Sequence, residues 1–292
     1  MKERLITTRE LKALAEEGTS AHRLWTGGDN WIDRFGDDYV ISTKGDGRDL
    51  VEPLARWTNA LGLETGRVFV RRLVKQAKED HSPEQVAGEE LPLKTVVSER
   101  GLKFGIDFSA GYSAGLFCDQ RANRAHLESL RPKRVLNCFS YTCAFSVAAA
   151  RAGAETLSLD LSRKSLDRGR ENFLLNDMPL DGHRFIADDV FAVLPKLERK
   201  GEKFDAIVLD PPTFSRGVKG RIFRAEQDFG ELLELAKGVA QRGAHILLST
   251  NSRELNVYAL KSFAHRLRTN AVAPPPEYPP DSAATTLWVA AP

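Results

Sequence analysis

The chain carries a distinctive group of residues directly after an apolar run, Asp210-Pro211-Pro212-Thr213-Phe214. The run itself, residues 204–209 (FDAIVL), has the length and composition of a buried strand. The two prolines end the strand and restrict the turn, the carboxylate accepts hydrogen bonds, and the phenyl ring offers a stacking surface. These residue types suit a site that holds a flat, polar ring. We therefore interpret Asp210, Pro211, Pro212 and Phe214 as the substrate side of an enzyme that modifies a nucleobase.

Three further strand ends carry residues that suit the binding of a cofactor. An acid at the second of these ends, Asp160, followed by Leu161, can accept both hydroxyls of a ribose. The third end is Asp188-Asp189, where a carboxylate can accept from an adenine amine. Each acid has an alternative role, because an acid after a strand is often the N-cap of the next helix. The first end is rich in hydroxyl groups, and its candidate residues are Asn137, Phe139, Ser140, Tyr141 and Thr142.

These ends belong to a regular alternation of apolar strands and helices that begins at residue 135. Such alternation predicts a mostly parallel, doubly wound α/β sheet, in which ligands bind outside the carboxyl ends of the strands. The first loop contains neither G-x-G-x-x-G nor a P-loop, which argues against a dinucleotide-dependent dehydrogenase and a nucleotide triphosphatase. We expect strands over residues 135–139, 156–160, 184–186, 204–209, 244–250 and 285–290, and helices over 122–130, 144–152, 162–176, 190–200, 225–241 and 255–267.

The residues before this alternation read as a small α+β domain over residues 1–110, followed by the Rossmann-like domain over 111–292. The prolyl tract 274–280 (PPPEYPP) is expected to form a rigid connection into the last strand. In the small domain we expect helices over residues 1–20 and 50–61, strands over 38–43, 67–73, 93–99 and 102–108, and a loop over 76–90.

The composition is that of a globular protein, with 42% apolar and 28% charged residues among 292. No apolar run approaches the roughly 20 residues of a membrane helix, and the N-terminus lacks the apolar core of a secretion signal. We therefore expect a cytoplasmic protein that does not contact a membrane. The three cysteines, Cys118, Cys138 and Cys143, have no histidine at a ligand spacing and predict neither a disulfide framework nor a metal site.

Basic residues gather in two segments, although the net charge is only +2. Arg216, Lys219, Arg221 and Arg224 follow the Asp210 turn with no acid among them. A phosphate-binding surface beside the site and an ordinary solvated surface are equal alternatives there. For the second segment, which lies within residues 67–78, we favour the solvated surface.

Taken together and in this order, the four strand ends resemble those of a class I S-adenosylmethionine-dependent methyltransferase. FSYT (139–142), DPPTF (210–214) and the upstream GLFCDQR (115–121) resemble a group of bacterial enzymes that methylate bases of large-subunit ribosomal RNA, over about residues 20–260. Within that group, DPPTFS and the polar segment STNSRE (249–254) are most similar to the guanine-N7 module of the bifunctional large-subunit rRNA methyltransferase. The resemblance implies S-adenosylmethionine as cofactor and RNA as partner, and leaves the oligomeric state open.

The resemblance also implies roles for single residues. Asp119 would face the ammonium group of the cofactor and Arg121 its carboxylate, unless the two form an ion pair that fixes the start of the next helix. Phe214 would stack the target base, and Asn251 would read a base edge.

The alternative within the group is transfer to cytosine C5. Members with that activity normally carry a cysteine in the segment equivalent to STNS (249–252), and this chain has none there. Carbon 5 of cytosine is a poor nucleophile, so a thiolate must first add to the ring. Guanine N7 already has an in-plane lone pair and needs only proximity and alignment. The absent cysteine favours a nitrogen acceptor, and an exocyclic amine stays an alternative to N7.

Cys143 stands where the resembling family usually has glycine. One interpretation is a small side chain that packs under the cofactor, which we favour. The other is a reactive thiol whose pKa falls at a helix N-terminus. Because glycine permits a closer backbone approach, this change keeps a non-catalytic RNA-binding or assembly factor as an alternative function.

Overall fold

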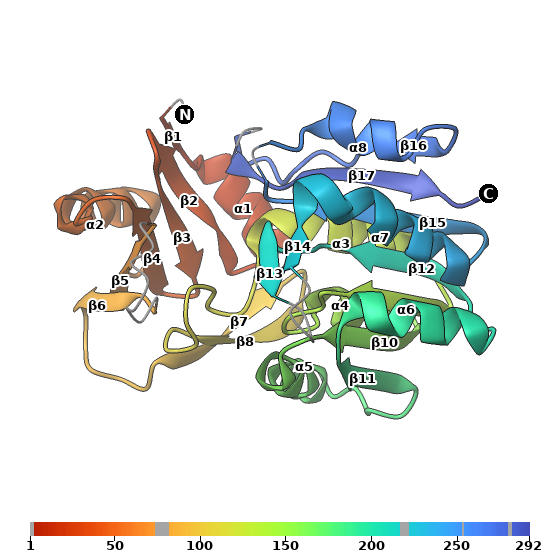
Figure 1. Ribbon diagram of the computed structural model, residues 1–292. Coiled ribbons are helices and arrows are strands. Elements are labelled where there is room, and N and C mark those ends of the chain that lie inside the picture. Colours follow the sequence, from red (N-terminus) through yellow and green to blue (C-terminus); the bar gives the residue numbers. More distant parts are fainter. Residues whose placement is uncertain (1–2, 74–81, 217–221, 253, 280–281) are drawn as a thin grey trace. The chain divides into compact units, whose positions relative to one another are not determined.

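A computed structural model of the chain describes residues 3–73, 82–216, 222–252, 254–279 and 282–292, and of residues 214–216 and 222 only the backbone. The chain forms two compact units (Figure 1). The first comprises Met1–Asp119 with Pro275–Ser282, and the second comprises Gln120–Pro274 with Ala283–Pro292. From the sequence, a boundary was expected near residue 110, and residues 275–282 were not expected to belong with the N-terminal residues.

The first unit is built on a six-stranded sheet, counted over its described residues, in the order β1-β2-β3-β4-β5-β6. Neighbouring strands are antiparallel except β4 and β5, whose parallel pairing requires the crossover that α2 (Val51–Leu61) supplies. Helix α1 (Thr8–Glu16) begins at a capping box formed by Thr7 and Glu10. The strands are β1 (Arg4–Leu5), β2 (Ala21–Gly27), β3 (Asn30–Phe35), β4 (Asp38–Thr43), β5 (Val68–Arg72), β6 (Glu84–Ala87) and a separate pair, β7 (Lys94–Glu99) and β8 (Leu102–Asp107).

Parts of this unit differ from the sequence-based expectation. Strands β2 and β3 were not predicted, because polar residues occupy buried positions in them and break the alternation of apolar side chains. Arg23 on β2 donates from Nε to Oδ1 of Asp33 on β3 at 2.7 Å, and both side chains are buried. The loop expected over residues 76–90 contains β6, which pairs with β5. The helix expected over residues 1–20 is limited to α1, with β1 before it.

Tyr278 holds the prolyl segment within the first unit. Its side chain is 5% exposed, and the guanidinium of Arg23 lies 4.5 Å from the centre of its ring. Burial raises the pKa of the Tyr278 hydroxyl well above its ordinary value. In the same unit, Trp25 and Trp57 stack at 5.2 Å within the apolar core, so these two tryptophans are core residues.

The second unit contains a seven-stranded sheet, counted over its described residues, in the order β11-β10-β9-β12-β15-β17-β16 (Figure 1). The first five strands run parallel, β17 is antiparallel to β15, and β16 is antiparallel to β17. The predicted Rossmann-like, mostly parallel and doubly wound α/β fold is therefore confirmed. The strands are β9 (Arg134–Cys138), β10 (Glu155–Asp160), β11 (His183–Ala187), β12 (Phe204–Leu209), β15 (Ala240–Thr250), β16 (Arg268–Asn270) and β17 (Thr285–Ala290).

Helices cover both faces of this sheet and explain its apolar strands. Helix α4 contacts α3 and α5, and α7 contacts α6 and α8, which gives two layers. Leu136 and Cys138 of β9 pack in the cluster that includes α6, α7 and α8, whereas Val135, directly before Leu136, packs with α3 and α4 on the other face. The helices are α3 (Arg121–Ser129), α4 (Ala144–Arg151), α5 (Arg163–Leu175), α6 (Val190–Arg199), α7 (Ala225–Val239) and α8 (Val257–Phe263).

Strand order reverses between β9 and β12, because the chain first runs outward through β10 and β11 and then returns to the other side of β9. This is the switch point at which open α/β sheets bind ligands. Three short strands of the unit were not predicted, namely β16 and the hairpin of β13 (Phe214–Arg216) and β14 (Ile222–Arg224). No helix among the described residues is long and apolar enough to cross a membrane.

Candidate active site

The loop after β9 is hydrogen-bonded to the end of β10. The backbone N–H of Ser140 donates to a β10 carbonyl at 3.0 Å, and that of Tyr141 donates to Oδ2 of Asp160 at 2.8 Å. Phe139, Tyr141 and Cys143 all have left-handed backbones, with φ values of 57°, 47° and 61°. Each such residue costs about 1–3 kcal/mol and persists only where its surroundings hold it. The loop therefore has a strained shape that is fixed by its contacts with β10.

Asp160 is the centre of these contacts. Its Oδ1 accepts from the backbone N–H of Ser162 at 2.8 Å, while Oδ2 holds Tyr141. Burial raises the pKa of the Asp160 carboxyl, against the opposing effect of these two backbone hydrogen bonds. Each oxygen keeps a second acceptor position. Leu161, directly after it, is 39% exposed and offers an apolar surface beside the carboxylate.

The two acids after β11 differ in their roles. The backbone N–H of Asp188 donates to the carbonyl oxygen of Asp160 at 3.1 Å, which joins the ends of β10 and β11. The Asp188 carboxylate is half-buried, accepts from the backbone of Asp189 at 2.8 Å and from Lys196 at 3.3 Å, and its pKa is lowered by these bonds. Asp189 is buried and accepts from the N–H of Phe191 at 2.9 Å as the N-cap of α6. The helix-cap interpretation therefore fits Asp189.

Other loop residues predicted for the cofactor point into the interior. Asn137 is buried and donates to Oγ of Ser146 on α4 at 2.9 Å. Ser140 and Thr142 are buried as well, and the Thr142 carbonyl accepts from Asn172 at 2.9 Å. Tyr141 is only half-buried, and its hydroxyl accepts from Arg168 on α5 at 3.5 Å. Most of these side chains hold the loop in place.

Cys143 is fully buried and begins α4. Burial raises the pKa of its thiol to about 11, which is opposite to the alternative of a reactive thiol and agrees with the favoured interpretation of a packed side chain. The side chain fits because Gly169 on α5 lacks one: a Cβ at residue 169 would lie 2.4 Å from the Cys143 Sγ. Gly169 was not identified from the sequence.

Asp119 and Arg121 fall in different compact units. Asp119 belongs to the first unit, where its charge acts on Arg23 and Tyr278. Arg121 is buried at the start of α3 in the second unit. Their joint role at the amino-acid end of a cofactor stays a prediction.

Asp210 stands at the switch point. Leu209, the last residue of β12, pairs with Cys138 of β9 on one side and with Leu248 of β15 on the other. Asp210 is therefore level with the start of the loop after β9. Asp210 is half-buried, Pro211 is buried and Pro212 is exposed, while the side chain of Phe214 lies outside the described residues.

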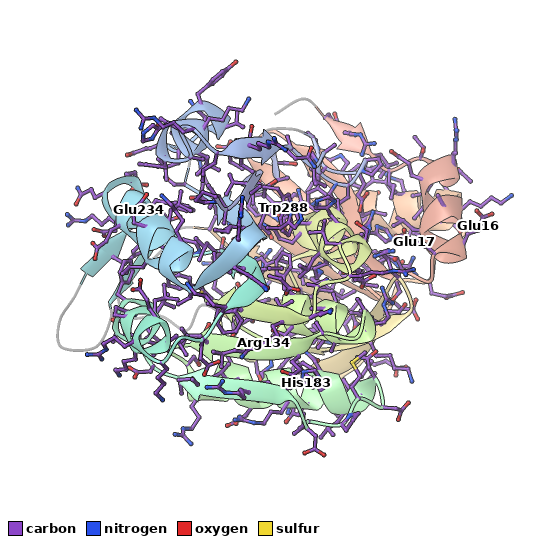
Figure 2. The ribbon with its side chains drawn as sticks, turned by 90° about the vertical axis from the view of Figure 1, so that its right-hand side faces the viewer. Glu16, Glu17, Arg134, His183, Glu234 and Trp288 are labelled. Atoms are coloured by element: carbon purple, nitrogen blue, oxygen red, sulfur yellow. The ribbon has the colours of Figure 1, made fainter. Side chains whose placement is uncertain are left out.

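The end of β15 is level with Asp210 and is held by hydrogen bonds. Ser249 is buried and accepts from Nε2 of Gln120 at 2.8 Å. Gln120 in turn accepts from Asn123 at 2.9 Å, whose Oδ1 accepts from the indole of Trp288 at 2.9 Å (Figure 2). Asn251, predicted to read a base edge, is exposed. Gln120 was not identified from the sequence, although it lies between two candidates, Asp119 and Arg121.

Phe223 connects the two groups of strand ends. It lies on β14, in the hairpin that follows the Asp210 turn, and is buried. Its ring is 5.9 Å from that of Phe139 in the first loop and 5.7 Å from that of Phe191 at the start of α6. Phe139 is thus packed in the apolar cluster under the loop. Among the described residues, no group of three or more His, Cys, Asp and Glu side chains is placed to hold a metal ion.

The chemistry of the residues at these strand ends fits S-adenosylmethionine. A half-buried carboxylate, fixed by two backbone donors and with acceptor positions left, suits a ribose diol, and an exposed leucine beside it suits an adenine face. The bound cofactor would supply the methyl group, and the residues after β12 and β15 lie level with the loop that would hold it.

Comparisons with known proteins agree with this interpretation. The "Ribosomal RNA large subunit methyltransferase I" of Aeromonas salmonicida is 38% identical over 164 residues, which are 56% of this chain and 41% of that protein. The protein of the same name from Cronobacter sakazakii is 35% identical over 209 residues, 68% of this chain and 53% of its own length. The matched segment thus spans about half the length of these relatives or less.

Solved structures share the fold. SMU.776, crystallised in complex with SAH, superimposes with a TM-score of 0.81 at 23% identity, over 97% of this chain and 79% of its own. A SAM-dependent methyltransferase from Agrobacterium tumefaciens gives a TM-score of 0.74 at 22% identity, over 93% and 90%. The family model described as "S-adenosylmethionine-dependent methyltransferase" matches residues 49–286. The chain therefore belongs to the family of S-adenosylmethionine-dependent methyltransferases, with S-adenosylmethionine as its methyl donor.

Proposed function

We propose that the chain transfers the methyl group of S-adenosylmethionine to a base of large-subunit ribosomal RNA, with guanine N7 as the acceptor atom. Both relatives named above are large-subunit rRNA methyltransferases by name, which supports the RNA class. We place this activity in the cytoplasm, and we assign contact with the RNA in part to the first unit.

The observation that carries the choice of atom is the cysteine-free segment STNS (249–252) at the end of β15, level with Asp210. A transfer to cytosine C5 needs a thiolate that reaches the ring. All three cysteines lie in the described residues and all are buried. Within the second unit, burial raises the pKa of Cys143 to about 11 and raises that of Cys138 further, so neither is a nucleophile at neutral pH. Guanine N7 needs no such group, because its lone pair attacks the methyl carbon directly.

In this proposal Asp160 binds the ribose of the cofactor, Leu161 packs against its adenine and Asp188 accepts from the adenine amine. The backbone of residues 139–142 lines the methionine part, and Asp119 and Arg121 bind its amino and carboxylate groups. The acceptor base lies at Asp210 and the two prolines, with Phe214 stacked on it and Asn251 at its edge.

The test is transfer of labelled methyl groups to rRNA from cells that lack the gene, followed by mass analysis of the nucleosides. We expect 7-methylguanosine in the large-subunit RNA. Formation of 5-methylcytidine would instead support the C5 alternative, and an N2-methylated guanosine would support an exocyclic amine. Binding of RNA with no methyl transfer under any condition would support the assembly-factor alternative.

A further inference from the structure

The first turn of α7 connects the two loops of the acceptor side. The backbone N–H of Ala225 donates to the carbonyl oxygen of Thr213, in the turn that follows Asp210, at 3.2 Å. The next residue, Glu226, accepts a hydrogen bond from the hydroxyl of Ser252, in the segment after β15. Two neighbouring residues of one helix therefore bridge the ends of β12 and β15.

The hydroxyl side chains of residues 249–252, at the end of β15 and directly after it, are all engaged within the protein. Ser249 accepts from Gln120, and Thr250 Oγ1 accepts from the backbone N–H of Ser252 at 3.1 Å. The Ser252 hydroxyl donates to Glu226 and accepts from a backbone N–H at 3.2 Å. These three side chains are buried. Of the four residues 249–252, all described, only Asn251 is exposed, so the segment presents one side chain and anchors the others.

The backbone of the N-cap residue of α7 is held by an acid other than Glu226. Asp228, two residues further on, accepts from the backbone N–H of Arg224, the N-cap residue, at 2.7 Å. Glu226 instead directs its carboxylate to Ser252, and this bond lowers its pKa, so it is ionised at neutral pH. A hydroxyl that donates to a carboxylate forms one of the stronger hydrogen bonds in proteins. The bond thus fixes Ser252, which directly follows Asn251.

We propose that Glu226 is a positioning residue for methyl transfer, which holds Ser252 and thereby sets the place of Asn251 relative to Asp210. The inference rests on the proposed function in one respect, that these two loops hold the acceptor. It is independent of which base or atom is methylated.

The experiment compares Glu226→Ala, Glu226→Gln and a control, Glu234→Ala, on the same helix. Glu234 is exposed, and both oxygens of its carboxylate accept from Lys237 at 2.9 Å (Figure 2). Because a misplacement of about 1 Å can reduce a rate by about 10²-fold, we expect Glu226→Ala to lower kcat at least tenfold. Glutamine keeps an acceptor oxygen for Ser252, so Glu226→Gln should restore kcat to within about threefold of wild type. The Kd for SAH should stay unchanged in all three variants.

Other results would overturn the inference. If Glu226→Gln is as slow as Glu226→Ala, the charge acts directly and the hydrogen bond to Ser252 is not the cause. If Glu226→Ala has the kcat of the wild type, or loses SAH affinity along with its activity, the residue does not position the acceptor side. Ser252→Ala removes the other end of the same bond and should reproduce the loss of kcat if Glu226→Ala fails to fold. Any RNA that the wild type methylates serves as substrate, so a wrong base assignment leaves the test intact.

Discussion

Gly169 makes room for Cys143, and Gly169→Ala tests whether that fit keeps the cofactor loop in its binding shape. The added Cβ would stand 2.4 Å from Sγ and 3.0 Å from Cβ of Cys143. Ordinary contacts between such atoms are about 3.5–4.0 Å, so one side must move by about 1 Å. Helix α5 is anchored by the buried side chains of Leu166 and Phe173. We therefore expect the strained loop after β9, rather than α5, to move.

The expected size of the effect follows from the cost of overpacking, which is about 1–3 kcal/mol. If the overpacking destabilises the loop conformation that binds SAH by this amount, the Kd for SAH rises about 5–150-fold. About 1.4 kcal/mol corresponds to a factor of ten in Kd. Helix propensity acts in the opposite direction, because alanine favours a helix interior over glycine by about 1 kcal/mol. A loss of affinity without a large loss of thermal stability would therefore identify the clash with the loop as its cause.

The assay is calorimetric titration with SAH, beside a thermal unfolding curve for each variant. The double variant Cys143→Gly/Gly169→Ala removes the thiol that clashes and should regain most of the affinity. The matched control is Gly230→Ala on α7, where the new Cβ would lie 3.4 Å from Phe263, at the limit of ordinary contact, and should leave SAH binding unchanged. The reasoning is refuted if Gly169→Ala binds SAH as the wild type does, or if the double variant binds no better than the single one.

Three further predictions concern Asp210, Asp160 and Tyr278. Asp210→Ala should abolish methyl transfer to RNA while calorimetry with SAH shows largely unchanged affinity; a parallel loss of both would place Asp210 on the cofactor side. The folded-state pKa of Asp160 is raised above its ordinary 3.8, so its contribution to stability is complete below that value and is lost as the pH rises through the raised pKa. SAH affinity should increase over the same window, because the ionised form accepts the ribose hydroxyls, and a titration of Asp160→Asn that keeps this pH dependence would contradict the assignment. Tyr278→Ala should lower the free energy of unfolding of the first unit by about 3–5 kcal/mol in denaturant melts, as for other buried aromatics. Leu91→Ala, at a side chain of the same unit that is 54% exposed, should change it by less than about 0.5 kcal/mol, and equal effects of the two would argue against the role of Tyr278.

The strands whose ends form the site could be predicted, because each is recognised from a short, continuous stretch of the sequence. Each strand of the parallel sheet is a short apolar run, and the residue that follows it is at the sheet's carboxyl edge whatever the neighbours of the strand. This is why Asp160, Asp188 and Asp210 could be assigned to strand ends. The functions of those side chains depend on local bonds that a strand end alone does not specify. Asp189, for example, caps α6, whereas its neighbour Asp188 joins two strands.

The missed features of the site involve residues far apart in the chain. Ser249 is held by Gln120, 129 residues away, and Ser252 by Glu226, 26 residues away. Such pairs depend on the order of strands in the sheet and on how each helix is rotated above it, and a single sequence encodes neither as a pattern. The β2–β3 pair of the first unit was missed for a related reason, because the buried charges of Arg23 and Asp33 are compensated by each other across the two strands.

The packing role of Gly169 could have been predicted from the sequence. A glycine in a helix interior is unfavourable, so it calls for a packing reason, and the loop expected to carry glycine carries Cys143. A close approach of a loop to a helix needs a missing side chain on one side only. The resembling family has that glycine in the loop, whereas this chain has a glycine in the facing helix, at the point where the thiol enters. The departure from the family pattern is therefore matched within the same site, which favours a working cofactor loop over a lost one.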